Sequence, residues 1–241
     1  MNIRNKRVLI TGATGAIGTA ITGALAKHEN NLLLHFHNSC DKAEILKKES
    51  IAAGSKAKIL SIDLSNAENA AKLAEMAHDL LGKIDLLIDT SSTFNKTPFG
   101  SVSESDWDEA INTNLKSKFF LSQAIAEHMD DAVGRIILFS DIAANKPYGN
   151  YLPYCISKAG IDALVRGLSK ILAPTVLVNG IAPYIVTRPR DMSDEKWNNL
   201  LSRTPANRPT STDEILDLID SLCSKECKIT GRILTLDGKD F

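Results

Sequence analysis

The sequence contains little cysteine. Its four cysteines, Cys40, Cys155, Cys223 and Cys227, are too few among 241 residues for the disulfide framework of a small secreted domain. This usage is typical of a reducing compartment. Cys223 and Cys227 lie one helical turn apart, but no second pair and no nearby histidine completes a tetrahedral site, so we expect no bound metal.

Neither charge is in excess, and no long apolar run is present. The 28 Lys and Arg residues nearly balance the 29 Asp and Glu residues, without the single-sign run of a basic arm or an acidic tail. We therefore expect no nucleic-acid partner. No apolar stretch approaches the length of a membrane span, and residues 1–7 are polar, unlike a signal peptide. We expect a cytoplasmic protein that binds no membrane.

The chain instead alternates short apolar runs with longer amphipathic segments. This alternation predicts βαβ units, whose right-handed crossovers build a parallel sheet with helices on both faces. We predict one α/β domain over residues 1–241, with a Rossmann-type doubly wound parallel sheet of about seven strands. The proline-rich section 183–209 is predicted to be irregular and suited to a lid over the substrate. The predicted strands are residues 7–11, 32–37, 57–61, 84–89, 134–140, 176–181 and 232–237.

A glycine-rich turn follows the first predicted strand. Such a turn lets backbone N–H groups approach a pyrophosphate, and the N-terminus of the next helix supplies partial positive charge. Glycine turns also occur for packing alone, but this position in an alternating α/β chain favours dinucleotide binding. The residues predicted to bind this part of the cofactor are Gly12, Thr14, Gly15, Ile17 and Gly18.

The end of the second strand distinguishes NAD from NADP. An acidic residue there would bind the ribose hydroxyls of NAD and repel the 2′-phosphate of NADP. The sequence lacks it and offers His37, Asn38 and Ser39 as hydrogen-bond donors, so we predict NADP(H). NAD(H) is the alternative, because no arginine is present to bind the phosphate. Asp63 and Leu64 are placed to contact the adenine, although a helix cap also explains this segment.

A tyrosine and a lysine four residues apart follow the fifth predicted strand. Tyr154 and Lys158 share one helix face, so the ammonium can stabilise a tyrosinate and bring the pKa of the tyrosine nearer neutral. Tyr154 can then exchange a proton with a substrate while a nicotinamide transfers hydride. An isolated pair of this kind is usually a solvated helix face, but its position in this chain makes it a catalytic candidate.

Taken in order, these motifs resemble the short-chain dehydrogenase/reductase family over essentially the whole chain. The resemblance implies an NAD(P)-dependent oxidoreductase in which Asn114 holds a water in a proton relay and Lys158 also binds the nicotinamide ribose. It further implies cofactor contacts at Ser91, Pro183 and Ile185. A surface or cap role is the alternative for Asn114. The ordered set comprises Thr11-Gly12 to Gly18, Asp63, Asn114, Ser140-Asp141, Tyr154 to Lys158, Val178-Asn179, Ile229-Thr230-Gly231 and Asp237-Gly238.

Several positions depart from the family pattern. Ala16 stands where the middle glycine is usual, residues 89–92 read Asp-Thr-Ser-Ser instead of Asn-Asn-Ala-Gly, and Tyr184 replaces a glycine. These changes leave the cofactor fold intact.

The position thirteen residues before Tyr154 is a further departure. The family usually has serine there, whereas this chain has Asp141, with Ser140 one place earlier. Both are catalytic candidates. Successive residues that leave a strand point to opposite sides, so only one of them should face the cleft, and we predict that it is Asp141.

An aspartate at this place is similar to the pteridine reductases within the family. The segments 35–39, 91–94 and 97–98 share further features with that subgroup, in which the aromatic residue matching Phe94 stacks on the pterin. A flat nitrogen heterocycle suits these residues, because an aromatic face gives stacking and a carboxyl group near Tyr154 helps to protonate a ring nitrogen. We predict substrate contacts at Ser92, Phe94 and Tyr184. In the alternative reading Phe94 covers the sheet and Asp141 caps a turn.

Three functions follow from these motifs. The leading prediction is an NADP(H)-dependent reductase of a small carbonyl or pterin-like compound, with Tyr154 as the proton donor. A reductase of 3-oxoacyl or sugar-type ketones is the alternative, with Ser140 as the usual serine. From a different class, the chain can be a dinucleotide-binding sensor or structural member with little turnover.

The resemblance also implies a homo-oligomer, a tetramer or a dimer. The family usually pairs the helices that follow the fourth and fifth strands, which here are residues 105–129 and 150–172. Their apolar residues are numerous enough for both a core face and a partner face. These residues include Trp107, Ile111, Phe119, Ile161 and Leu164.

Overall fold

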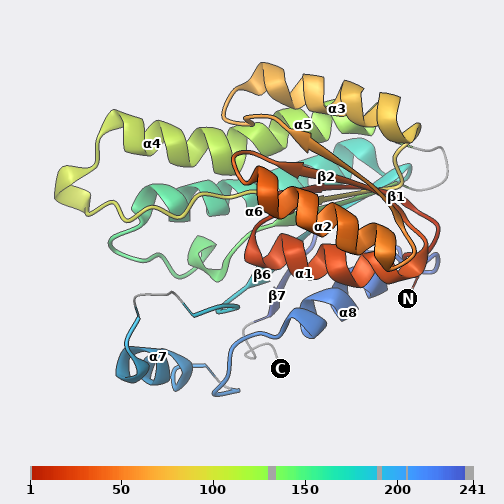
Figure 1. The fold of residues 1–241 in the computed structure, drawn as a ribbon. Helices are drawn as coiled ribbons and strands as arrows, with labels where there is room; N and C mark the ends of the chain where they lie inside the picture. Colours follow the sequence, from red (N-terminus) through yellow and green to blue (C-terminus); the bar gives the residue numbers. More distant parts are fainter. Residues whose placement is uncertain (1, 130–133, 189–191, 205, 237–241) are drawn as a thin grey trace.

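A parallel sheet forms the centre of the molecule (Figure 1). The computed structural model describes residues 2–129, 134–188, 192–204 and 206–236. Over these residues the sheet has seven strands in the order β3-β2-β1-β4-β5-β6-β7, all paired in parallel. The strands are β1 (Arg7–Thr11), β2 (Asn31–Phe36), β3 (Lys56–Ser61), β4 (Leu86–Asp89), β5 (Gly134–Phe139), β6 (Val176–Pro183) and β7 (Ile233–Leu236).

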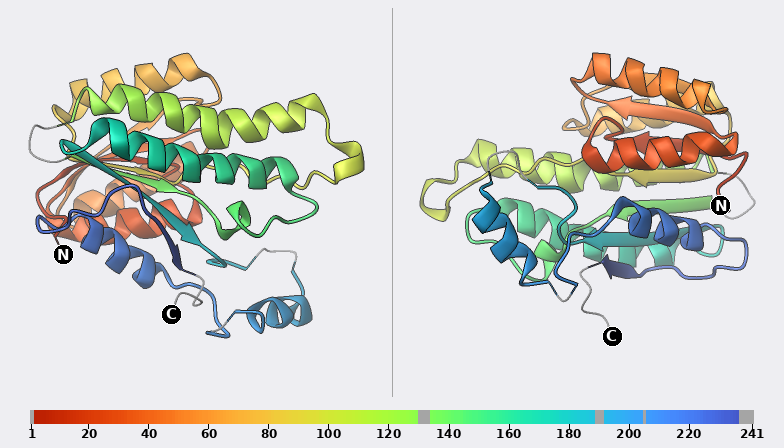
Figure 2. Two further views of the ribbon diagram at one scale, coloured as in Figure 1. Left: turned by 180° about the vertical axis from the view of Figure 1, so that it is seen from behind. Right: turned by 60° about the horizontal axis from the view of Figure 1, so that its bottom comes forward.

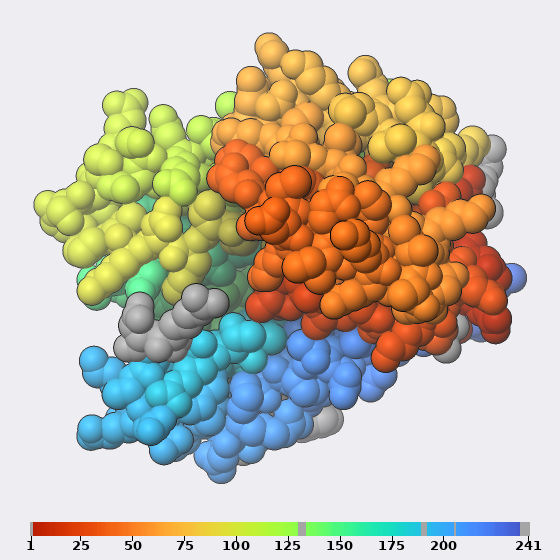
Figure 3. Space-filling model, viewed as in Figure 1, coloured from red at the N-terminus to blue at the C-terminus, as the bar shows by residue number. Residues whose placement is uncertain are grey.

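Helices cover both faces of this sheet (Figure 2). On one face α3, α5 and α6 pack over the sheet, and on the other α1, α2 and α8 do so. In the space-filling view α2 covers the centre of one side, with α7 and α8 below it (Figure 3). The helices are α1 (Ala16–Leu25), α2 (Cys40–Ala52), α3 (Ala67–Leu81), α4 (Glu104–Ile111), α5 (Ser117–Ala126), α6 (Leu152–Leu172), α7 (Asp194–Leu201) and α8 (Thr212–Leu222).

Alternating strand residues build a core on each side of the sheet. Leu9 and Leu87 belong to the cluster with α3, α5 and α6, whereas their neighbours Ile10 and Ile88 belong to the cluster with α1 and α8. All four side chains are fully buried. A strand buried on both faces needs a continuous apolar run, which explains why the sequence shows runs rather than an alternating pattern.

The predicted doubly wound parallel sheet is confirmed, with strand bounds within two residues of the prediction except where residue 237 lies outside the described part of the chain. Two segments differ. The helix predicted over residues 105–129 is divided by a π-helical turn, Asn112–Lys116, and ends at Ala126. The section 183–209, predicted to be irregular, contains α7, which begins at the Ser193 cap. The motif at 237–238 also lies outside the described residues.

The order of the strands reverses between β1 and β4. The chain continues from β1 to one side of the sheet and returns to β4 on the other, so the loops after these two strands diverge at the carboxyl edge. Ligands of open α/β sheets bind at such a switch point. The predicted site residues follow β1 to β6, which brings them to this edge.

The described residues contain no helix that is long and apolar enough to cross a membrane. Within the same residues, no three His, Cys, Asp or Glu side chains come close enough together to hold a metal ion. All four cysteines are free thiols.

Candidate active site

The loop after β1 needs glycine at two positions. Gly12 has a φ of 64°, in the left-handed region, and a Cβ on it would lie 2.8 Å from the backbone of Ser91. A Cβ on Gly18 would clash with the carbonyl oxygen of Gly12. These two glycines therefore let the loop turn tightly into α1 and lie against the segment that follows β4.

The N-terminus of α1 is open to an anion. Gly15 is its cap residue and provides no side chain to accept from the first N–H groups, and no acidic residue lies in the first turn. Ala16 is the first residue of the helix, and Thr14 and Ile17 flank it, both partly exposed. Unpaired N–H groups and the helix dipole favour a phosphate here, so the predicted glycine turn fits the pyrophosphate of a dinucleotide.

The surface after β2, which is predicted to contact the adenosine of the cofactor, is exposed and polar. His37, Asn38 and Ser39 follow β2 and lie on the surface. Asp63 also lies at the surface, and its carboxylate accepts hydrogen bonds from the N–H (2.9 Å) and hydroxyl (2.8 Å) of Ser65. These bonds hold the pKa of Asp63 below its usual range. The helix cap that was the alternative for this segment is Asn66, whose side chain accepts from the N–H of Glu68 at the start of α3, while Leu64 is buried.

Lys42 is a cation that the sequence analysis missed. It lies in the first turn of α2, and its Nζ donates to the carbonyl oxygen of Thr14 at 2.8 Å. The bond places an ammonium between the glycine turn and the end of β2. A phosphate-binding arginine was expected directly after the strand, whereas the charge of Lys42 comes from the following helix.

Tyr154 and Asp141, the predicted catalytic residues, are in direct contact. The Tyr154 hydroxyl donates to Asp141 Oδ2 at 2.7 Å, while Asp141 Oδ1 accepts from the N–H of Ala143 at 2.7 Å. Asp141 thus caps the short 3₁₀ turn Ile142–Ala144 with one oxygen and holds the tyrosine with the other.

The expected catalytic role of Ser140 is not supported by its orientation. Its hydroxyl donates to Asp162 Oδ1 at 2.5 Å, eight residues beyond Tyr154 on the same helix, α6. The two side chains therefore reach different turns of this helix. Asp141 is therefore the residue of this pair that meets Tyr154, as predicted.

The electrostatics of Tyr154 differ from the prediction. Burial and the neighbouring Asp141 carboxylate raise the pKa of Tyr154 far above its usual value, instead of lowering it toward neutral. Burial also raises the pKa of Asp141. Lys158 Nζ donates to the carbonyl oxygen of Phe139 at 2.9 Å and lies 5.5 Å from the centre of the Tyr154 ring. Tyr154 is consequently a protonated hydrogen-bond donor here.

Lys158 loses its proton at a lower pH than an ordinary lysine. Burial, followed by the charge of Lys118, lowers the pKa of Lys158 to about 8. The predicted pair on one face of α6 is thus present, but its ammonium is held by a backbone carbonyl rather than by the tyrosine oxygen.

Asn114 lies in the π-helical turn and is fully buried. Its Oδ1 accepts from the N–H of Thr93 (2.8 Å) and the hydroxyl of Ser92 (3.1 Å), and its Nδ2 donates to the carbonyl oxygen of Thr93 (3.0 Å). Asn114 therefore holds the loop that carries Phe94. π-helical turns are often found at functional sites.

Aromatic rings gather beside Tyr154. Phe94, 52% exposed, stacks on Tyr151 with ring centroids 4.3 Å apart and meets the Tyr154 ring edge-on at 4.7 Å. Tyr148 packs edge-on against Tyr151, and Tyr184 acts electrostatically on Tyr148. Tyr148 and Tyr151 were missed by the sequence analysis, although both lie within six residues of Tyr154. The predicted substrate residue Phe94 thus contacts the ring of Tyr154, the predicted proton donor.

The remaining predicted cofactor residues lie at the same edge of the sheet. The Ser91 hydroxyl donates to Asp89 Oδ1 at 2.6 Å, and the Ser91 backbone lies close to Gly12. Pro183 ends β6, and the buried Ile185 accepts a backbone hydrogen bond from Thr210 at 2.7 Å.

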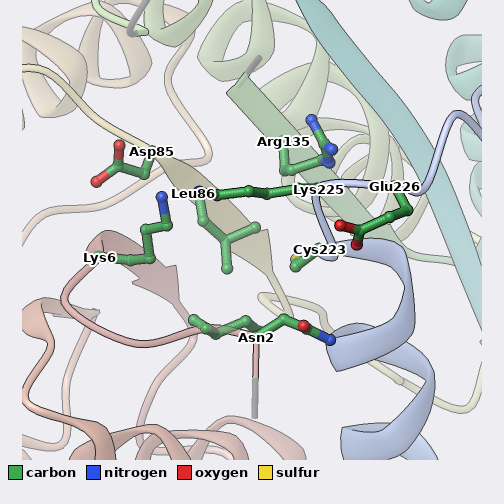
Figure 4. Close-up of a pocket in the computed structure, with 9 residues that line it drawn as sticks. Asn2, Lys6, Asp85, Leu86, Arg135, Cys223, Lys225 and Glu226 are labelled. Atoms are coloured by element: carbon green, nitrogen blue, oxygen red, sulfur yellow. The ribbon is translucent and has the colours of Figure 1, made fainter. Parts of the chain in front are cut away.

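A pocket of about 390 Å³ lies at the opposite edge of the sheet (Figure 4). Asn2 and Lys6 line it before β1, Asp85 before β4 and Arg135 at the start of β5. None of the predicted site residues lines this pocket, so it is separate from the site around Tyr154.

The family follows from the sequence comparison together with this geometry. A sequence model of the short chain dehydrogenase family matches residues 6–199. The chain belongs to this family. It is therefore an oxidoreductase, and the predicted family and enzyme class are confirmed.

Similar proteins cover nearly the whole chain. Gluconate 5-dehydrogenase of Gluconobacter oxydans is 27% identical over 98% of this chain and 95% of its own length. The 3-oxoacyl-[acyl-carrier-protein] reductase FabG of Staphylococcus epidermidis is 27% identical over 97% and 98%. Among solved structures, FolM alternative dihydrofolate reductase 1 from Brucella canis, complexed with NADP, has a TM-score of 0.87 and 27% identity over 96% and 92%.

Proposed function

We propose that this short-chain dehydrogenase reduces a pterin-like nitrogen heterocycle with NADPH. The observation that carries the proposal is the hydrogen bond from Tyr154 to a buried carboxyl group, Asp141, beside the exposed ring of Phe94. A carboxyl group behind the proton donor suits a basic ring nitrogen, and an exposed aromatic face suits a flat ring.

The residues of the chain supply the proton for this reduction. NADPH, when bound, provides the hydride that reaches the carbon of the C=N bond. The Tyr154 hydroxyl gives its proton to the ring nitrogen. Asp141, when it is protonated, then returns a proton to the tyrosinate along the 2.7 Å hydrogen bond, and burial raises the pKa of this carboxyl group. The Lys158 charge stabilises the tyrosinate in the interval.

Reduction of a 3-oxoacyl or sugar-type ketone is the second candidate function. The names of the gluconate 5-dehydrogenase and the 3-oxoacyl reductase favour it, whereas that of the dihydrofolate reductase favours the pterin-like substrate. The two candidates differ in the residue that supports Tyr154, which is Asp141 for a heterocycle and Ser140 for a ketone.

We expect the purified protein to reduce a dihydropterin with a kcat/KM at least about tenfold above that for acetoacetyl thioesters or small sugar ketones. The measurement is the loss of NADPH absorbance with each substrate, after nucleotide binding has been confirmed by fluorescence. Higher values for the ketones would contradict the pterin-like proposal. Nucleotide binding without turnover of any substrate would favour the sensor.

We also propose that NADPH is preferred over NADH. The free N-terminus of α1 suits the pyrophosphate, and Lys42 together with His37, Asn38 and Ser39 suits the 2′-phosphate. Lys42→Ala is expected to raise the Kd for NADPH about tenfold, because it removes a charge-assisted contact, and to leave the Kd for NADH within about twofold.

Lys48→Ala is the matched control for this experiment, because Lys48 is an exposed lysine later in α2. Titration of nucleotide fluorescence gives both dissociation constants. Equal losses for the two nucleotides, or a wild-type preference for NADH, would show that Lys42 does not bind the phosphate.

We propose further that the chain forms a homo-oligomer through α4, α5 and α6. An apolar hollow on this side is lined by Leu115, Phe119, Phe120 and Leu164, and Phe119 is 46% exposed. Ile161, in contrast, is fully buried in the core. Light scattering is expected to give the mass of a dimer or tetramer at micromolar concentration, since an exposed apolar face of this kind is typical of a partner surface.

Phe119→Asp is expected to shift this mass toward the monomer, because it buries a charge in the interface. Ile51→Asp, at an exposed isoleucine of α2, is the control and should keep the oligomer. A monomeric wild-type protein would contradict the proposed assembly.

A cytoplasmic location is proposed on the four free thiols. Thiols of this kind persist in a reducing compartment. The proposed partners are a small-molecule substrate and further copies of the chain.

A further inference from the structure

A buried ion pair lies at the ends of β1 and β4. Lys118 Nζ is 2.8 Å from Asp89 Oδ1, and both side chains are completely buried. Burial opposes the charge of Asp89, but the ammonium of Lys118 and the hydrogen bonds on the carboxylate hold its pKa below the usual range. Since an isolated buried charge is strongly unfavourable, each of these residues depends on the other.

The pair is hydrogen-bonded to the end of β1 and to the loop after β4. Asp89 Oδ1 also accepts from the hydroxyl of Thr11 (2.5 Å), and from the N–H (3.1 Å) and hydroxyl (2.6 Å) of Ser91. Lys118 donates two further hydrogen bonds to Ser91, to its carbonyl oxygen (2.6 Å) and its hydroxyl (2.8 Å). The end of β1, the loop after β4 and the start of α5 therefore meet at one pair of charges.

These bonds hold Ser91 in place. Its backbone packs so closely on Gly12 that a Cβ on the glycine would lie 2.8 Å away. Thr90 adds a hydrogen bond to the carbonyl oxygen of Thr11 at 2.7 Å. The spacing between the glycine turn and the loop that leads to Phe94 thus depends on the position of Ser91.

We propose that Asp89 and Lys118 are a pair of positioning residues that hold the loop after β4 against the glycine turn and thereby set the affinity for the dinucleotide. The proposal rests on the dinucleotide site described above, but not on the identity of the substrate.

The pair also acts electrostatically on Lys158. The charged groups that act on Lys158 are Lys118, Asp141, Asp89 and Asp162. Lys118 lowers the pKa of Lys158, and Asp89 raises it. Neutralising one partner alone must therefore move this pKa in a direction that depends on which partner is lost, whereas a general loosening of the loop would move it in the same direction for both.

The experiment compares Asp89→Asn, Lys118→Met and the double variant, with NADPH as the probe and no substrate present. Each change keeps the volume of the side chain close to that of the original. Both single variants are expected to bind NADPH about tenfold or more weakly and to melt at a lower temperature, because each leaves one buried charge without its partner. Lys72→Met, at an exposed lysine of α3, is the control.

The double variant separates positioning from stability. Replacement of a buried ion pair by neutral groups often restores stability, so we expect the melting temperature to return toward that of the wild type. The affinity for NADPH should nevertheless stay about fivefold or more below the wild type, because Ser91 has lost its ammonium donor. Wild-type affinity in a stable double variant would overturn the proposal. If neither single variant folds, the double variant alone still tests the proposal.

The pH dependence of NADPH binding gives the second result. The alkaline decrease in affinity, which follows the loss of the proton from Lys158, is expected to shift to lower pH in Asp89→Asn and to higher pH in Lys118→Met. Shifts in the same direction would overturn the electrostatic part of the proposal. Failure of the pterin-like proposal would leave these binding measurements unchanged, because they contain no substrate.

Discussion

Tyr154→Phe is expected to reduce kcat/KM by about 100-fold to 10,000-fold, the contribution typical of a general acid. The substitution removes only the hydroxyl that gives the proton. The ring stays in its edge-on contact with Phe94, so the Kd for NADPH should remain within about threefold of the wild type. Steady-state rates and fluorescence titration measure the two effects separately.

Tyr151→Phe is the matched control for this substitution. It keeps the ring that stacks on Phe94 at 4.3 Å and removes a hydroxyl that is not assigned to proton transfer. Its rate should stay within about threefold of the wild type. A Tyr154→Phe enzyme that turns over as fast as this control would remove Tyr154 from the mechanism.

The glycine turn and the pair of Tyr154 and Lys158 could be predicted because each depends on local spacing. The tight turn needs glycine at Gly12, which has a positive φ, and at Gly18, where a Cβ would meet the carbonyl oxygen of Gly12. A spacing of four residues places Tyr154 and Lys158 on one helix face. The contact of Asp141, and not Ser140, with the tyrosine was also predicted, and Tyr154 does donate to Asp141 while Ser140 bonds to Asp162 on the same helix.

The electrostatics could not be predicted in the same way. The pKa of Tyr154 depends on how deeply it is buried and on the direct contact with Asp141, and neither follows from the spacing of Tyr154 and Lys158. The ammonium of Lys158 is bound by the carbonyl of Phe139, which lies on another element. Sequence spacing places charges near each other, but the fold decides which atom each charge meets.

Partners that are distant in the sequence were missed for a related reason. Lys118 follows Asp89 by 29 residues and stands next to a run of apolar residues, so nothing nearby marks it as one half of an ion pair. Lys42 contacts Thr14 across 28 residues. Both contacts depend on the order of the strands, which brings the ends of β1, β2 and β4 together.

Asp141→Ala is expected to reduce dihydropterin reduction by about 10-fold to 100-fold and to change ketone reduction much less. The variant removes the carboxyl group that returns a proton to Tyr154. It also removes a charge that raises the pKa of Tyr154, so tyrosinate should form at lower pH than in the wild type. The test assays Asp141→Ala and Ser140→Ala on a dihydropterin and on a small ketone.

Ser140→Ala provides the contrast because its hydroxyl bonds to Asp162 and not to Tyr154. Loss of its hydrogen bond to Asp162 is expected to lower the free energy of unfolding by about 1–3 kcal/mol and to leave the preference between the two substrates unchanged. If Ser140→Ala were the more damaging change and ketones the better substrates, the pterin-like proposal would be replaced by the ketone-reductase function.

The dependence of the wild-type rate on pH tests the role of Asp141 independently. The pKa of Asp141 is raised by burial, so its protonated form persists to higher pH than that of an exposed aspartate. Only this form can return a proton to Tyr154, and dihydropterin reduction should therefore fall as the pH rises through that pKa. Asp141→Ala should lose this decrease while Ser140→Ala keeps it. A decrease that survives in Asp141→Ala would assign it to another group and remove Asp141 from the proton pathway.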